Sequence, residues 1–91
     1  MTYGKYIIVL VSGCELAVMF DCIISHDSFL QSFHKDSIIS AGFFEVSAEP
    51  KEDDKQDISV YVFGKSDTLK LKTRKEDKRL LKNVLRKVGS F

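Results

Sequence analysis

The sequence has almost no net charge and no long apolar run, and each absence narrows the range of functions. Fourteen basic residues nearly balance thirteen acidic ones, for a net charge of +1. Attraction of the whole molecule to nucleic acid or to an anionic membrane is therefore disfavoured, and it would have to come from a local patch. The apolar runs at 6–11 and 16–20 are too short for an export signal or a membrane span. We expect a cytoplasmic protein with no membrane partner.

Cysteine is scarce, and the two cysteines are badly placed for a disulfide. If one extended strand joins Cys14 and Cys22, their Cα atoms lie roughly 26 Å apart. A disulfide requires Cα atoms within about 7 Å of each other. Two free thiols are typical of a reducing compartment, which again predicts the cytoplasm.

Motifs for catalysis, metal binding and phosphate binding are also missing. Cys22, His26 and His34 lack the paired spacing that brings two ligands to one side of a metal ion. No Gly-Lys-Ser/Thr pattern opens a helix. Cys14 lies beside Glu15, whose negative charge disfavours a reactive thiolate. We therefore predict a non-enzymatic protein with no metal and no cofactor, and we keep a small enzyme with an unrecognised site as the third interpretation.

What the sequence does have is the composition of a small globular protein. Apolar residues make up 44% and charged residues 30% of the chain, which is typical of folded rather than disordered proteins. Ninety-one residues predict a single domain, 1–91, with a marginal core. Self-association that covers leftover apolar surface is then a reasonable expectation, which makes a homodimer one predicted arrangement.

Five segments have the pattern of β-strands. The apolar and β-branched run over residues 5–11 is typical of a strand covered on both faces. Ser12–Glu15 breaks this run and predicts a hairpin turn in which Gly13 takes a positive φ. Later in the chain, Leu69 and Leu71 alternate with lysines, which indicates one buried and one wet face. The predicted strands are 5–11, 16–20, 37–46, 57–63 and 68–72.

Two helices are expected between and after these strands. Ser25 is a candidate N-cap for a short helix, and Thr73–Glu76 has the pattern of a capping box that starts a longer C-terminal helix. Residues 48–57, which include the only proline, Pro50, predict a mobile acidic loop. The order is ββαβββα, which predicts an α+β fold with an antiparallel sheet of about five strands. The apolar face of the long helix consists of Leu80, Leu81, Val84, Leu85 and Val88, and Gly89 ends it.

The charges are unevenly divided along the chain. Residues 1–57 contain four basic residues against ten acidic ones, a net charge of −6. Residues 58–91 contain ten against three, a net charge of +7. An acidic first part can dock on a basic protein surface by complementary charge, whereas a basic last part can follow a phosphate backbone.

Three stretches, Phe20–His26, Ser40–Phe43 and Gly64–Asp77, resemble parts of small uncharacterised proteins that bacteriophages and prophages encode. The likeness extends from residue 6 to residue 85, and the acidic loop is longer here than in that pattern. The resemblance implies a phage origin and supplies no catalytic residue. Small phage proteins without enzymatic motifs often bind a host machine, including immune systems such as CRISPR.

Our preferred interpretation is a protein that binds a host protein or nucleoprotein complex, as an inhibitor of a host defence complex in the anti-CRISPR manner. Phe43 and Phe44 are adjacent in a strand and so point to opposite faces. With both helices on one face, some aromatic side chains remain exposed on the other and mark an interface. The predicted protein-binding residues are Glu49, Glu52, Asp53, Asp54, Phe43, Tyr61 and Phe63.

The alternative interpretation is a nucleic-acid-binding module that uses the basic C-terminal strand and helix. Only Tyr61 and Phe63 are available nearby to stack on bases, and no recognised nucleic-acid motif is present. The predicted residues for this alternative are Lys70, Lys72, Lys78, Arg79, Lys82 and Arg86.

Overall fold

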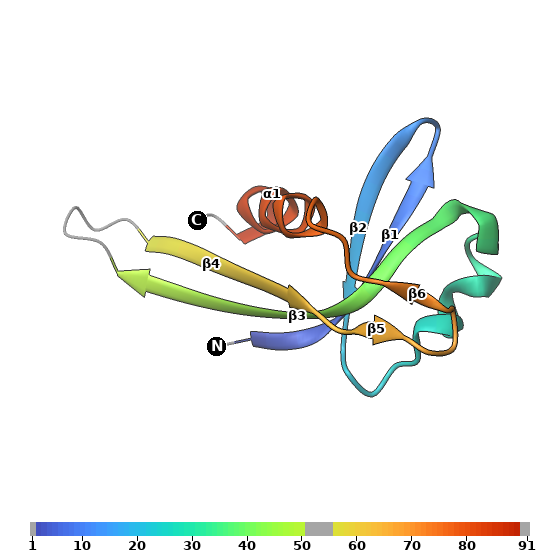
Figure 1. The fold of residues 1–91 in the computed structure, drawn as a ribbon. Helices are drawn as coiled ribbons and strands as arrows, with labels where there is room; N and C mark the ends of the chain where they lie inside the picture. The colour runs from blue at the N-terminus through green and yellow to red at the C-terminus, as the bar shows by residue number, and fades with distance from the viewer. Residues whose placement is uncertain (1, 51–55, 90–91) are drawn as a thin grey trace.

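A four-stranded antiparallel sheet and a C-terminal helix make up most of the structure (Figure 1). The computed structural model describes residues 2–50 and 56–89. The α+β class and the antiparallel sheet are confirmed. The elements in chain order are β1 (Thr2–Val11), β2 (Cys14–Phe20), the 3₁₀ segments η1 (His26–Gln31) and η2 (Lys35–Ser37), β3 (Ile38–Pro50), β4 (Gln56–Phe63), β5 (Lys65–Ser66), β6 (Leu71–Lys72) and α1 (Asp77–Gly89).

The main sheet has the strand order β2-β1-β3-β4, with all neighbouring strands antiparallel. β1 and β2 are joined by Ser12 and Gly13, whose φ angles of 51° and 80° are both positive, as in the turns that best fit the twist of a hairpin. The predicted positive φ at Gly13 is confirmed. The turn holds two residues rather than four, because Cys14 and Glu15 already pair with β1.

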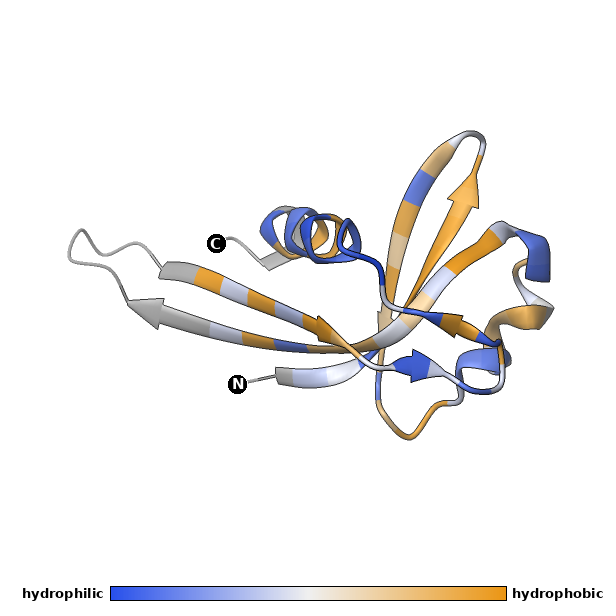
Figure 2. Ribbon diagram, in the orientation of Figure 1, coloured by the Kyte–Doolittle hydropathy of each residue, from blue (hydrophilic) through white to orange (hydrophobic). Residues whose placement is uncertain are grey.

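Helix α1 covers one face of this sheet. Leu81 is fully buried, and Leu80 and Leu85 pack partly buried beside it, so the predicted apolar face of the C-terminal helix is confirmed at these three positions. In Figure 2 the polar residues of α1 lie on the side turned away from the strands. The buried residues of this first core are Tyr6, Ile8, Phe44, Val46, Val60 and Leu81.

The opposite face is covered over only part of its area. Phe29 and Phe33, from the segment that contains η1 and η2, pack there against a second buried cluster. Because Tyr6–Val9 are all buried, β1 is covered on both faces there, as its apolar run predicted, whereas Leu10 and Val11 at the end of that run are exposed. The buried residues of this second core are Ile7, Val9, Ile38, Ala41 and Leu69.

The prediction of an α-helix after Ser25 is wrong. The segment forms two short 3₁₀ turns instead. Ser25 adopts an extended N-cap conformation but makes no side-chain bond to the helix backbone. Its hydroxyl donates to the Asp27 carboxylate instead. Without that cap, the free N–H groups of a first α-helical turn lose their best partner. The two predicted helices therefore do not share a face of the sheet, since η1 and α1 lie on opposite sides.

The predicted fifth strand also differs from the structure. Of residues 68–72, only Leu71 and Lys72 are extended, and they pair with Lys65 and Ser66 in a separate two-stranded sheet. The intervening residues form a turn in which Lys70 has a φ of 56°, which ends the strand geometry. The order ββαβββα with one sheet of about five strands is therefore replaced by a four-stranded sheet and a small hairpin.

The predicted loop at 48–57 is partly strand. Glu49 pairs with Asp57 and Pro50 with Gln56, so β3 and β4 extend the ladder into this region. Among the described residues, β3 pairs beyond Val46 only with β4, so Pro50 lies on an edge of the sheet, where proline is tolerated. The rest of the predicted loop, residues 51–55, lies outside the described residues.

The predicted capping box is replaced by a different arrangement. Helix α1 begins at Asp77, and the Asp77 carboxylate accepts the backbone N–H of Arg74 at 3.0 Å. Thr73 Oγ1 lies instead 3.1 Å from the Tyr6 hydroxyl in the middle of the sheet. Gly42 makes room for this contact, since a Cβ at that position would clash with Thr73 Oγ1. The start of the helix is thus fixed by the sheet rather than by its own first turn.

The fully buried carboxylate of Asp77 joins the helix to β1 and β2. The Tyr6 hydroxyl donates to it at 2.6 Å, and Arg74 Nε donates at 3.0 Å. The guanidinium of Arg74 continues to Glu15 on β2, with Nη2 and Oε1 2.6 Å apart. A hydroxyl has one proton, and the carboxylate is the stronger acceptor, so the Thr73 hydroxyl donates to Tyr6. Burial and the Asp77 acceptor raise the pKa of Tyr6 well above its usual range.

We expect Tyr6→Phe to lower the free energy of unfolding by about 1.5–3 kcal/mol, because it removes a hydrogen bond to a buried charged group. The matched control is Tyr61→Phe, which deletes the same hydroxyl from a side chain that is 69% exposed and should change stability by less than about 0.5 kcal/mol. Urea unfolding of both variants provides the measurement. Equal effects of the two substitutions would contradict the structural role of this network.

Candidate functional site

The uncovered part of the second sheet face carries a group of aromatic and charged side chains, which we call the aromatic face. Strand register places Lys5, Phe43 and Phe63 in one row across β1, β3 and β4, and Tyr3, Glu45 and Tyr61 in the next row. Side chains two residues apart in a strand point to the same side. The six residues therefore form one surface, which is defined as Tyr3, Lys5, Phe43, Glu45, Tyr61 and Phe63.

Three rings of this face pack against one another. The centroids of Tyr3, Phe43 and Phe63 form a triangle with sides of 5.9, 6.1 and 6.3 Å, and the ring planes lie within 27° of each other. Such contacts add to the stability of each ring position beyond simple burial. The ammonium of Lys5 lies 5.9 Å from the Phe43 centroid, within the range of a cation–π contact. The aromatic face is thus an ordered surface.

The aromatic face is open to solvent in spite of its apolar content. Tyr3 is 53%, Tyr61 69% and Phe63 38% exposed, while Phe43, Lys5 and Glu45 are half-buried. Its charge is balanced, with one lysine and one glutamate. Contiguous exposed aromatic side chains of this kind mark sites of interaction, because leaving them in water is unfavourable.

The buried side chain of His26 packs against the aromatic face at Phe43. Its ring meets Phe43 edge-on, with centroids 5.7 Å apart, and meets Phe20 in the same way at 5.5 Å. His26 Nε2 lies 2.9 Å from the Gly42 carbonyl oxygen. Because a carbonyl only accepts, Nε2 carries the proton and donates. Burial lowers the pKa of His26 below 6.5, and the nearby Lys5 adds to this effect.

The structure brings together the three aromatic residues that were predicted for protein binding. Phe43 and Phe44 lie on opposite faces, with Phe44 in the core under α1. Tyr61 and Phe63 share the exposed face. Tyr3 was missed, because the predicted first strand began at Lys5. The alternation of Tyr3, Lys5 and Ile7 against buried Tyr6 and Ile8 was the available signal. Whether these residues bind a protein stays a prediction.

The acidic residues predicted for the same site are largely outside the described residues. Glu49 lies in β3 opposite Asp57. Glu52, Asp53 and Asp54 fall between the two described ranges, and their part in the site stays a prediction.

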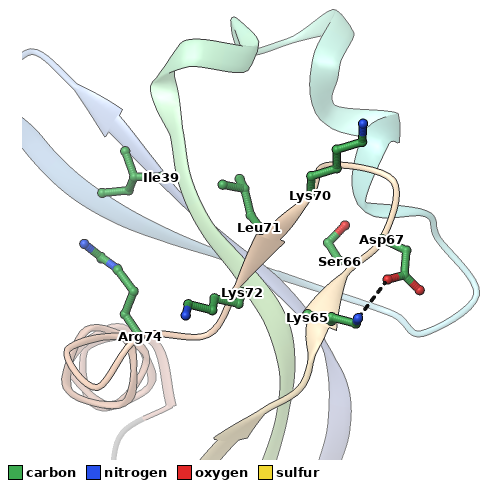
Figure 3. Close-up of a pocket in the computed structure, with 8 residues that line it drawn as sticks. All are labelled: Ile39, Lys65, Ser66, Asp67, Lys70, Leu71, Lys72 and Arg74. Atoms are coloured by element: carbon green, nitrogen blue, oxygen red, sulfur yellow. Dashed lines mark ion pairs between the residues drawn. The ribbon is translucent and has the colours of Figure 1, made fainter.

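The basic residues predicted for nucleic-acid binding divide between two places. Lys70 and Lys72 line a groove of about 660 Å³ beside the β5–β6 hairpin, together with Lys65 and Arg74 (Figure 3). The other four belong to α1, where Lys78, Arg79 and Arg86 are exposed and Lys82 is half-buried. The segment from Lys72 to Lys78 connects the two basic areas along the chain. Nucleic-acid binding through them stays a prediction.

Groups that support catalysis or metal binding are sparse in the residues described. Cys14 is exposed and Cys22 half-buried, and both are free. Within 2–50 and 56–89, no three side chains of histidine, cysteine, aspartate or glutamate converge as a metal site would require. In the same ranges, no helix has the length and apolar character needed to cross a membrane.

Comparisons with known proteins return no relative. No protein-family model matches the chain, and neither curated proteins nor solved structures include a match. The geometry of the aromatic face and of the basic groove is therefore the basis of the functional proposals that follow.

His26 makes the stability of the aromatic face depend on pH. Because the pKa of His26 is lower in the folded than in the unfolded state, the unfolded state gains its proton first as pH falls through 6.5. The free energy of unfolding should decrease as pH falls through this value, and the decrease should level off where folded His26 is itself protonated. We expect His26→Gln, which retains a donor for Gly42 but does not titrate, to lose less stability between about pH 7.5 and about pH 5.5.

The measurement is urea unfolding of both proteins at the two pH values. Carboxylates titrate equally in the two proteins, so the difference between them isolates His26. Parallel decreases in wild type and variant would show that His26 is not held neutral.

Proposed function

We propose that this chain is a non-enzymatic protein that binds another protein through the aromatic face. The observation that carries the proposal is the packed triangle of Tyr3, Phe43 and Phe63, in which the rings contact one another while Tyr3 and Phe63 stay exposed. Aromatic side chains dominate the binding energy of many interfaces, because they bury large areas at low entropic cost. A triangle already held by its own contacts and by His26 loses little further freedom when a partner covers it.

The charge of the aromatic face favours a protein partner over nucleic acid. Nucleic-acid affinity depends on neutralising several phosphates with lysine or arginine. The aromatic face offers Lys5 alone, and Glu45 offsets it within the next row. A surface with an apolar centre and both charges nearby has instead the composition of a protein interface.

The partner we propose is a component of a bacterial host complex in the cytoplasm, and the action is inhibition of that complex. The resemblance to phage and prophage proteins supports this choice, and defence machinery such as a CRISPR effector is the leading class. Of the predicted acidic residues, Glu49 lies near the end of β3, and Glu52, Asp53 and Asp54 follow it along the chain. Their negative charge complements the basic nucleic-acid groove of such complexes.

Affinity purification from bacterial host cells, with variants at one exposed site, tests the proposal. Tyr61→Glu places a charge on the aromatic face at a side chain that is 69% exposed, so the fold should persist. Arg79→Glu changes the exposed face of α1 and is the matched control. We expect one host protein to be retained by wild type and by Arg79→Glu, and to be reduced at least about tenfold with Tyr61→Glu.

Three outcomes would overturn the proposal. One is a host protein retained equally by all three forms, and another is loss of retention with Arg79→Glu alone. The third is self-association abolished by Tyr61→Glu in sedimentation analysis with no host protein retained, which would assign the aromatic face to a second copy of the chain.

A further inference from the structure

A basic groove lies where the β5–β6 hairpin meets β3 and the start of α1. Its volume of about 660 Å³ is within the range of small-molecule sites. In Figure 3, Lys72 and Arg74 lie on one side of the groove, and Lys65 and Lys70 lie toward the other. The lining residues are Ile39, Lys65, Ser66, Asp67, Lys70, Leu71, Lys72 and Arg74.

The groove has an excess of positive charge, with four cations against Asp67 alone for a net charge of +3. Two of the cations are already engaged. Lys65 Nζ lies 3.6 Å from Asp67, and Arg74 is bound to Asp77 and Glu15. Lys70 and Lys72 have no carboxylate within 4.0 Å among the residues that the structure describes. These two lysines are the cations available to a ligand.

The backbone of Lys70 supports a role for its side chain. Its φ of 56° lies in the left-handed region that glycine and asparagine occupy most readily. A lysine at such a position is less favourable for folding than glycine. Backbone conformations of this kind cluster at functional sites, where the side chain compensates for the strain.

The groove also has an apolar part. Ile39 and Leu71 line it and are half-buried, so a ligand gains from an organic portion as well as from negative charge. Several cations around one space fit a phosphate, whose oxygens accept from more than one donor at once, better than they fit a single carboxylate. We propose that this groove binds an organic phosphate that carries more than one phosphoryl group, with Lys72 contacting it from one side, Lys70 contacting it from the other, and Ile39 and Leu71 contacting its organic part.

This site is distinct from the aromatic face and does not depend on the proposed function. The organic phosphate has two sources, a free nucleotide or adjacent nucleotides of a single strand. The probes are therefore ATP, a short oligothymidylate and inorganic phosphate, each titrated into the full chain at low ionic strength by calorimetry or fluorescence.

Two groove variants and one matched control accompany the wild type. Lys70→Gly relieves the left-handed backbone, so its melting temperature should equal or exceed that of wild type. Lys72→Glu replaces the positive charge of Lys72, the other cation available to a ligand, by a negative charge. We expect each to weaken ATP or oligothymidylate binding at least about tenfold, as loss of a charge-assisted hydrogen bond implies. Lys35→Glu, which makes the same charge change at an exposed residue of η2 outside the predicted basic residues, should bind within about twofold of wild type.

The outcomes separate the sources and can overturn the proposal. Tighter binding of ATP that depends on both groove lysines supports a free nucleotide, and tighter binding of oligothymidylate with the same dependence supports a strand. The proposal is overturned if neither ATP nor oligothymidylate binds wild type. It is also overturned if inorganic phosphate binds as tightly as both of them, if Lys70→Gly and Lys72→Glu bind like wild type, or if Lys35→Glu has the larger effect.

Discussion

The buried carboxylate of Asp77 is the constraint on which the rest of the structure depends. A charge that is fully removed from water is tolerated only when hydrogen bonds and an opposite charge replace its hydration. Here Tyr6 and Arg74 provide them. Removing one partner of a buried ion pair typically costs about 3–5 kcal/mol. Since Tyr6 lies in the centre of β1, this requirement fixes where the helix begins on the sheet.

The two candidate binding surfaces follow from that placement. Because Thr73 and Asp77 are held at Tyr6, the chain between β4 and α1 has to pass β3 at Gly42, where the absence of a side chain leaves room. The β5–β6 hairpin occupies this passage and forms one wall of the basic groove. Helix α1 then covers the sheet face that carries Tyr6. On the opposite face, His26 packs against Phe43 and the rest of the aromatic face is open to solvent.

Strand positions and faces could be predicted from local patterns, because alternation and apolar runs report directly on burial. The exposure of Tyr61 and Phe63 against buried Val60 followed from such alternation. Contacts between distant segments could not be predicted in this way. Thr73 and Glu76 form a good capping box locally, yet Tyr6 and Gly42 on the sheet determine what Thr73 contacts.

The same limit applies to the candidate sites. The basic groove is lined by residues between 65 and 74 and by Ile39 of β3. These two segments are distant in the sequence, so no local pattern predicts that they form one site. A lysine with a positive φ has no local signature, so the turn at Lys70 was read as a strand. By contrast, Phe43, Tyr61 and Phe63 could be predicted, since each follows or precedes a residue that packs into the core under α1. Tyr3 was missed because the predicted strand began at Lys5, three residues after the start of β1, and Lys5 and Glu45 were not predicted as site residues.

Site-specific photocrosslinking in host cells is the most direct test of the central claim, that the aromatic face contacts another protein. A benzophenone amino acid replaces Tyr61 in one form and Arg79, on the exposed side of α1, in the other. The account predicts a discrete covalent adduct to a host protein from position 61 and none from position 79. An adduct from position 79 alone, or no protein adduct from position 61, would contradict it.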